Sequence, residues 1–218
     1  MGTITRSFAN NITTSGVLLP ASLNNNSIAN VTAYNAAVAT GNMVLLSTQT
    51  ASASASISFT TGIDSTYKEY QFYLINCHPA TNNTNFSFNL STDGGANYNV
   101  TKTTTAFIAY ANEAGTDAGL QYQTGSDLAQ STGFQIFNEV TGNSNDDSSS
   151  GILTLFNPSS TTYVKHFIAI NQKSNNTDYS VNQFTAGYAN TTSAINAIQF
   201  KFVSGNIDDG IILMYGIK

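Results

Sequence analysis

Cys77, His78 and His166 are the natural candidates for nucleophilic or acid–base chemistry, because they are the only cysteine and the only histidines of this 218-residue chain. A cysteine nucleophile needs a histidine base within hydrogen-bond reach. Cys77 and His78 are neighbours in an expected strand, where successive side chains point to opposite faces. Their geometry is poorly suited to a dyad, and for His166 we expect a structural role in a strand. We therefore expect no catalysis by Cys77, His78 or His166.

The twelve acidic residues could supply the paired carboxylates with which glycoside hydrolases work. Most of them stand in turn-like sequence, where an aspartate side chain bonds to the local backbone: Asp64, Asp93, Asp117, Asp146, Asp147, Asp208 and Asp209. The segment 143–147 is rich in oxygen ligands but lacks the Gly and Glu that an EF-hand has at its sixth and twelfth positions. A single cysteine excludes a multi-cysteine metal site and an internal disulfide. We predict that the chain is no enzyme and needs no metal or cofactor.

Tyrosines offer a different kind of site, because a flat aromatic face can stack on a sugar ring. Tyr110, Tyr122 and Tyr179 lie at strand ends or in the expected loops 110–125 and 171–180. Packing in a core or an interface is the competing explanation, since β-sandwiches bury many aromatic side chains. If the chain recognises a host surface glycan, these three tyrosines are its predicted receptor-binding residues.

The composition predicts a β-protein with an uncharged polar surface. Only 9% of the residues are charged, against roughly 25% in an average soluble domain. Asn, Ser and Thr, which are abundant here, are poor helix formers. The seven basic residues do not cluster, so the chain has no electrostatic footprint for nucleic acid. No apolar run approaches the roughly 18 residues of a membrane span. We expect neither nucleic acid nor a membrane as a partner.

Residues 1–43 show neither the period of a strand nor that of a helix over any length. Their apolar residues are scattered, and we predict that they contact a partner protein: Ile4, Phe8, Val17, Leu18 and Leu19. The segment is therefore interpreted as an extended arm that anchors the chain, with a first β-hairpin of the same domain as the alternative. Residues 1–20 do not resemble a secretory signal, so synthesis in a cytoplasm is the expectation.

From Met43 onward, short strand-like runs alternate with turn signals, which is typical of a sandwich or barrel. The run 70–77 is apolar on both faces, which predicts a central strand buried on two sides. Residues 86–90 alternate, so one face should meet the core and the other water or a partner. Residues 93–96 predict a hairpin turn to a strand at 98–101. Further strands are expected at 44–47, 50–59, 106–109, 133–137, 151–156, 163–170, 184–188, 198–202 and 211–215, with loops at 143–150 and 171–179 and at most one helical turn at 127–130.

Several segments together resemble virion proteins of tailed bacteriophages, especially marine ones. The resemblance covers residues 44–218 and is carried by segments 67–72, 75–80, 91–95, 156–160, 187–188, 198–200, 205–210 and 214–217. It implies a jelly-roll-like antiparallel β-sandwich used in tail fibres, other surface appendages and capsid decoration proteins. It carries over no functional residue. Since only about 43 residues precede the module, decoration of the capsid stands beside a tail appendage as an expectation.

The combined prediction is a non-enzymatic structural protein on the surface of a bacteriophage virion, made in the host cytoplasm. Residues 1–43 form its anchoring arm and residues 44–218 its all-β, jelly-roll-like sandwich. The expected partners are further copies of the chain in a homotrimer and other virion proteins of the capsid or tail. The alternatives are a carbohydrate-binding module, against which the absence of tryptophan counts, and a receptor-binding adhesin for host glycans, against which the missing secretion signal counts.

Overall fold

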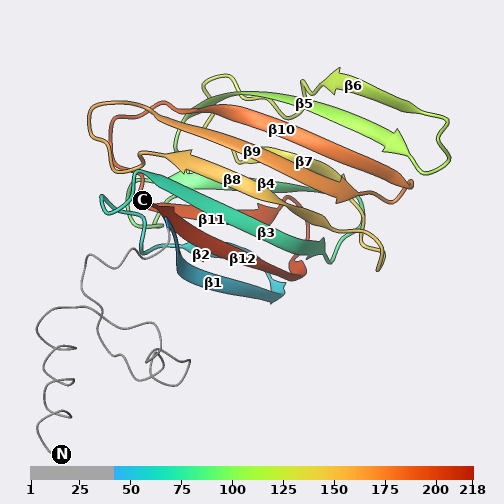
Figure 1. The fold of residues 1–218 in the computed structure, drawn as a ribbon, viewed down its shortest axis with the longest axis horizontal. Coiled ribbons are helices and arrows are strands. Elements are labelled where there is room, and N and C mark those ends of the chain that lie inside the picture. Colours follow the sequence, from blue (N-terminus) through green and yellow to red (C-terminus); the bar gives the residue numbers. More distant parts are fainter. Residues whose placement is uncertain (1–41) are drawn as a thin grey trace, which may run out of the picture. The chain divides into compact units, whose positions relative to one another are not determined.

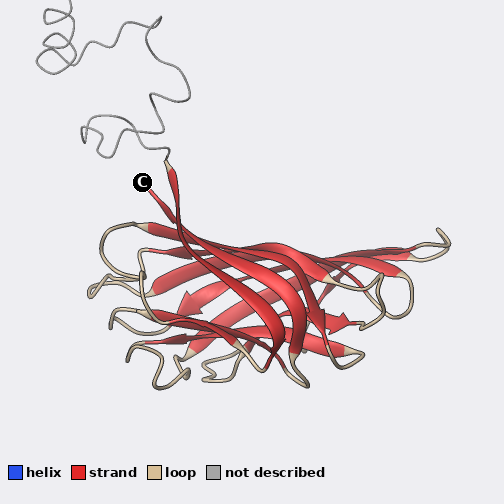
Figure 2. Ribbon diagram, turned by 90° about the horizontal axis from the view of Figure 1, so that it is seen from below, coloured by secondary structure: helices blue, strands red, loops and turns tan. Residues whose placement is uncertain are grey.

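The computed structural model describes residues 42–218, which form twelve strands in two antiparallel sheets and no helix (Figures 1 and 2). The predicted all-β fold is therefore confirmed. The strands are β1 (Met43–Ser54), β2 (Ile57–Phe59), β3 (Glu69–Pro79), β4 (Thr84–Ser91), β5 (Lys102–Asn112), β6 (Ala118–Tyr122), β7 (Gln135–Thr141), β8 (Ser149–Phe156), β9 (Lys165–Ser174), β10 (Tyr179–Ala189), β11 (Ala197–Phe202) and β12 (Ile207–Ile217).

The strand order is that of a jelly roll with an enlarged sheet. The larger sheet has the order β1-β12-β3-β8-β9-β10-β5-β6, and the smaller sheet has the order β2-β11-β4-β7. The first four strands of each sheet make the eight-stranded double Greek key of a jelly roll. Two insertions, β5–β6 after β4 and β9–β10 after β8, add four more strands to the larger sheet alone. The larger sheet thus extends past β7, the edge of the smaller one (Figure 1).

Phenylalanine rings fill the space between the sheets, in place of the tryptophan that the sequence lacks. Phe72 of β3, Phe88 of β4 and Phe200 of β11 are completely buried. The ring centroids of Phe86 and Phe202 lie 4.5 Å apart in a stacked pair. These rings come from alternate positions of their strands, which explains why a period of two in the sequence locates the core.

Two predicted elements, the strand 50–59 and the hairpin at 93–101, differ from the observed structure. The run 50–59 is no single strand, because the chain leaves the larger sheet after Ser54 and enters the smaller one at β2. Ala53 has a positive φ of 48° just before this change of sheet. The turn at 93–96 exists, with Gly94 and Gly95 at φ 74° and 91°, but residues 98–101 form no strand. Strand β4 pairs with β11 and β7 instead, so the predicted hairpin is wrong.

The predicted faces of two strands also need correction. β3 lies in the middle of the larger sheet, but only the face with Tyr70, Phe72 and Leu74 is buried, because no segment between residues 42 and 218 packs on the outer face. In β4 the supposed outer face is buried. Asn89 donates hydrogen bonds from Nδ2 to the carbonyl oxygens of Tyr98, at 2.6 Å, and Thr132, at 3.0 Å, so the segments before β5 and after β6 cover this face.

Two segments expected to be irregular belong wholly or mostly to strands. Asp208 and Asp209 lie in β12, next to register shifts against β3, and not in a turn. The expected loop at 171–179 is mostly strand, since β9 continues to Ser174 and β10 starts at Tyr179. The expected loop 143–150 is confirmed for residues 143–148, since β8 begins only at Ser149. β6 lies within the expected loop 110–125, where no strand is predicted. Residues 127–130 contain no helical turn.

Candidate functional site

Two of the three predicted receptor tyrosines meet at one end of the enlarged sheet. Tyr110 of β5 and Tyr179 of β10 have ring centroids 6.1 Å apart, at an angle of 54°. They share a face because Val181 pairs with Tyr110 in the β5–β10 ladder. Tyr122 of β6 lies on the opposite face, where its hydroxyl donates to Asp127 Oδ2 at 2.8 Å. The structure therefore groups Tyr110 with Tyr179 and separates both from Tyr122.

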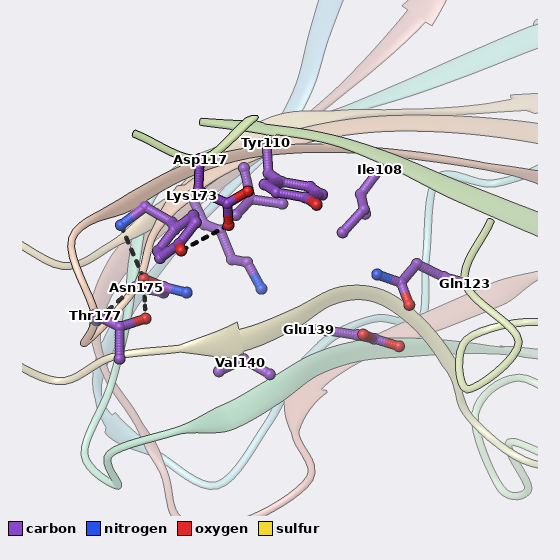
Figure 3. A pocket seen from close by; sticks show the side chains of 11 residues that line it. Ile108, Tyr110, Asp117, Gln123, Glu139, Val140, Lys173, Asn175 and Thr177 are labelled. Atoms are coloured by element: carbon purple, nitrogen blue, oxygen red, sulfur yellow. Dashed lines mark hydrogen bonds between the residues drawn. The ribbon is translucent and has the colours of Figure 1, made fainter. Parts of the chain in front are cut away.

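A pocket of about 270 Å³ opens beside these two tyrosines (Figure 3). One wall is the inner face of β5, β9 and β10, and the other is β7, where the smaller sheet ends. Ile108 and Val181 form its apolar part, and the polar lining residues are Asp117, Gln123, Glu139, Lys173, Asn175 and Thr177. The pocket exists because the larger sheet continues where no strand of the smaller sheet faces it. We call it the overhang pocket.

Lys173 is the residue of the overhang pocket that sequence reasoning missed. Its side chain is only 3% exposed, and Figure 3 shows it extending into the pocket toward Glu139. Among residues 42–218, no carboxylate lies within ion-pair distance of Nζ, and Nζ is not one of the fully enclosed polar atoms, so water in the pocket can reach it. Burial lowers the pKa of Lys173 to about 8, and the charge of Glu139 opposes that shift. Side chains alternate between the two faces of β9, and Lys173 lies on the same inner face as the buried Phe167. This alternation was the signal in the sequence that could have located it.

Glu139 is fixed in place by the structure around it. Its carboxylate accepts a hydrogen bond from the Ser126 hydroxyl. Its backbone N–H donates to Gln183 Oε1 at 3.1 Å, and Gln183 is completely buried. The next residue, Val140, has a positive φ of 54° and donates its N–H to Asn85 Oδ1 at 2.8 Å. These contacts hold a carboxylate at the mouth of the pocket opposite the Lys173 amine.

The β9–β10 turn forms the outer rim of the overhang pocket. Asn175 Oδ1 accepts hydrogen bonds from the backbone N–H groups of Thr177, at 3.1 Å, and Tyr179, at 3.0 Å. The Tyr179 hydroxyl donates to Asp117 Oδ2 at 2.9 Å, and this hydrogen bond raises the pKa of Tyr179. The rim therefore has an ordered network in which Asp117 is already engaged.

A second feature, on the opposite face of the larger sheet, is a continuous apolar row. Successive residues of this row lie directly opposite each other in neighbouring strands, from β12 to β6: Leu213, Tyr73, Ile152, Ile170, Phe184, Phe107 and Tyr122. Ile170, Phe107 and Tyr122 are 44%, 41% and 48% exposed. A parallel row consists of Tyr215, Gln71, Thr154, Ile168, Ala186 and Thr105. Neither row contains a charged residue, and together they form what we call the outer face.

The residues considered first for catalysis stay apart. Cys77 is completely buried, and this burial raises the pKa of its thiol to about 12. His78 points to the other side of β3, with Nδ1 3.7 Å from Asp208 Oδ2 and Nε2 3.2 Å from the Ser144 carbonyl oxygen. His166 lies on the same side of the larger sheet as the outer face but outside its two rows, with its ring 6.2 Å from that of Tyr188. Within the described part of the chain, no three metal-ligating side chains cluster.

The predicted anchoring residues lie outside the described residues: Ile4, Phe8, Val17, Leu18 and Leu19. Among residues 42–218, no helix is long and apolar enough to cross a membrane. Comparison with known proteins finds no matching family model, no matching curated protein and no matching solved structure.

Proposed function

We propose that this chain is a non-enzymatic structural protein of a bacteriophage virion surface, which forms a homotrimer through the outer face of its larger sheet. The observation that carries the proposal is the row of half-buried and exposed apolar side chains from Leu213 to Tyr122. Residues 1–43 attach the trimer to proteins of the capsid or tail. Jelly-roll topology supports this function, since such sheets are common in viral coats.

The outer face has the properties of a protein interface. Contiguous exposed apolar patches mark interaction sites, whereas single exposed apolar residues are ordinary. The row crosses seven of the eight strands of the larger sheet. Phe107 and Phe184 are stacked in it with ring centroids 4.8 Å apart, so it presents a flat and ordered aromatic surface. Tyr73 and Tyr215 add a second aromatic pair, with centroids 5.4 Å apart.

Another copy of the chain is the partner that fits this face best. The two rows lack charge, so two copies can approach without burying an unpaired ion, which would be costly. The cores of protein interfaces are likewise depleted of charged residues and enriched in aromatic ones. Closed symmetry limits such an assembly to a defined number of copies, as a virion component requires.

The molar mass of the full-length protein in solution tests this function. Size-exclusion chromatography with light scattering should give about 69 kDa, three times the 23.1 kDa of one chain. A mass of 23.1 kDa at micromolar concentration would contradict assembly through the outer face.

The attachment role is tested separately with the particle. A variant that lacks residues 1–41 should fold and form the same oligomer but should not co-sediment with virions. Co-sedimentation equal to that of the full chain would exclude anchoring by this segment.

A further inference from the structure

The overhang pocket has a lysine amine at its base that can bind a ligand. Lys173 is 3% exposed, and its Nζ donates no hydrogen bond to any residue between 42 and 218. An ammonium group has three hydrogens to donate, and Lys173 Nζ faces the open space of the pocket, where water can bond to it. A ligand that brings acceptor oxygens into the pocket would replace that water at the amine. Figure 3 shows the side chain aimed into the open space and not into the protein.

The other polar groups restrict the ligand to a neutral molecule. The Glu139 and Asp117 carboxylates line the same pocket and would repel an anion that approached Lys173. Lys173 in turn would repel a cation that approached the carboxylates. The pocket offers donors and acceptors side by side: the Lys173 amine, the amides of Gln123 and Asn175, and the Glu139 carboxylate. Adjacent hydroxyl groups, which both donate and accept, satisfy such an arrangement.

The remaining surface suits the carbon skeleton of a sugar. The Tyr110 ring and the side chains of Ile108 and Val181 form an apolar wall beside the polar groups. Aromatic faces pack against the C–H groups of a pyranose ring. The volume of about 270 Å³ is slightly below the usual range of small-molecule pockets, roughly 300 to 1,000 Å³. A single ring fits this space, with the rest of a chain outside.

We propose that the overhang pocket binds one neutral sugar ring of a glycan, with hydroxyl groups of the ring accepting from Lys173 and donating to Glu139, and with one ring face against Tyr110. The pocket opens on the inner side of the larger sheet and the outer face lies on the other side. Sugar binding and assembly are therefore independent, and either can fail without the other.

Saturation-transfer NMR with the full-length protein tests the proposal. The probes are the methyl glycosides of glucose, galactose, mannose and N-acetylglucosamine, with methyl glucuronide and glucosamine as charged probes. At least one neutral glycoside should receive saturation and bind with a millimolar dissociation constant. In Lys173→Met this binding should weaken at least tenfold, while Lys68→Met, which removes an exposed lysine outside the pocket, should bind as the unmodified protein does.

Glu139→Gln is a second, nearly isosteric variant that keeps the shape of the site, and it too should weaken binding severalfold. Circular dichroism melts confirm the fold of each variant. Three results would overturn the proposal: no neutral glycoside binds, Lys173→Met and Glu139→Gln bind unchanged, or only the charged probes bind.

Discussion

Phe107 and Phe184 lie directly opposite each other in the β5–β10 ladder, with parallel rings 4.8 Å apart on the exposed side of the sheet. Phe107 is 41% exposed in the isolated chain. Two large aromatic rings that stack in the open enlarge one continuous apolar surface. Both residues belong to strands that the two insertions add to the larger sheet, so the added strands supply part of the surface proposed for assembly.

Phe184→Glu should convert the assembly into monomers. It places a charge in the centre of the outer face, where association would bury it without a partner. The dissociation constant should rise at least tenfold, and light scattering measures the change. The fold should survive, with a loss of about 1 kcal/mol from the aromatic pair. Val203→Glu, at an exposed apolar residue outside the outer face, is the matched control and should remain oligomeric. If both variants assemble alike, the outer face is not the interface.

The stability of the fold should increase between pH 7 and pH 9. Burial lowers the pKa of Lys102 to about 7 and that of Lys173 to about 8, both from an ordinary value of 10.5. In this range the unfolded chain holds protons that the folded chain has lost, so the free energy of unfolding rises with pH. The gain is about 4 kcal/mol at most, because each lysine contributes up to about 1.4 kcal/mol per pH unit only where the pH exceeds its folded-state pKa.

Urea denaturation at constant protein concentration measures this pH dependence. Lys102→Met should reduce the slope, whereas Lys68→Met at an exposed site should leave it unchanged. Above pH 9 the slope should decrease and approach zero near pH 10.5, because the unfolded lysines then lose their protons and the Cys77 thiol, whose pKa is raised to about 12, ionises first in the unfolded chain. A stability that is flat or falls from pH 7 to 9 would show that the two lysines are not buried as described.

Asn89→Ala should be among the most destabilising single changes. Asn89 Oδ1 accepts a hydrogen bond from Lys102 Nζ at 2.5 Å, and its amide nitrogen donates to two backbone carbonyl oxygens. The truncation leaves a buried amine with one acceptor fewer and two carbonyl groups unpaired, at a cost of about 3 kcal/mol. Thermal unfolding measures the loss, and Asn99→Ala, at an exposed asparagine, should cost less than about 0.5 kcal/mol. Equal effects of the two changes would contradict the proposed network.

Gly210→Ala should damage the junction between β12 and β3. Gly210 has a φ of 136°, and an added Cβ would lie 2.8 Å from the Cys77 Cα, a backbone atom that cannot move aside easily. We expect a loss of about 2–4 kcal/mol. Gly115→Ala is the control, because Gly115 also has a positive φ but no atom lies within 4 Å of the added Cβ. It should cost only about 1 kcal/mol. A Gly210→Ala variant as stable as Gly115→Ala would contradict the β12–β3 geometry.

The sequence predicted the parts of this fold that depend on local pattern. Alternating residues such as Phe86 and Phe88 identified core strands, and the glycines at 94 and 95 identified a turn. It could not predict which strands pair, because pairing depends on contacts between distant segments. For that reason 98–101 was assigned to a hairpin, and the break after Ser54 was missed. Burial of Lys173 was missed for the same reason, since a lysine is ordinarily expected in water.

In the candidate sites, too, residue types could be predicted from the sequence, whereas their positions relative to one another depend on strand pairing. Tyr110 and Tyr179 could be selected by residue type, but only the β5–β10 register brings them together. The outer face could not be recognised before the strand order was known, because its apolar residues, such as Ile152 and Phe184, come from strands far apart in the sequence.

The central claim is that the outer face is buried between copies of the chain on a virion. A cryo-EM reconstruction of particles that carry this protein tests it most directly. We predict three-fold clusters of density in which Ile170 and Phe184 of each copy pack against a neighbouring copy. Copies that stand apart on the particle, with this face open to solvent, would contradict the claim.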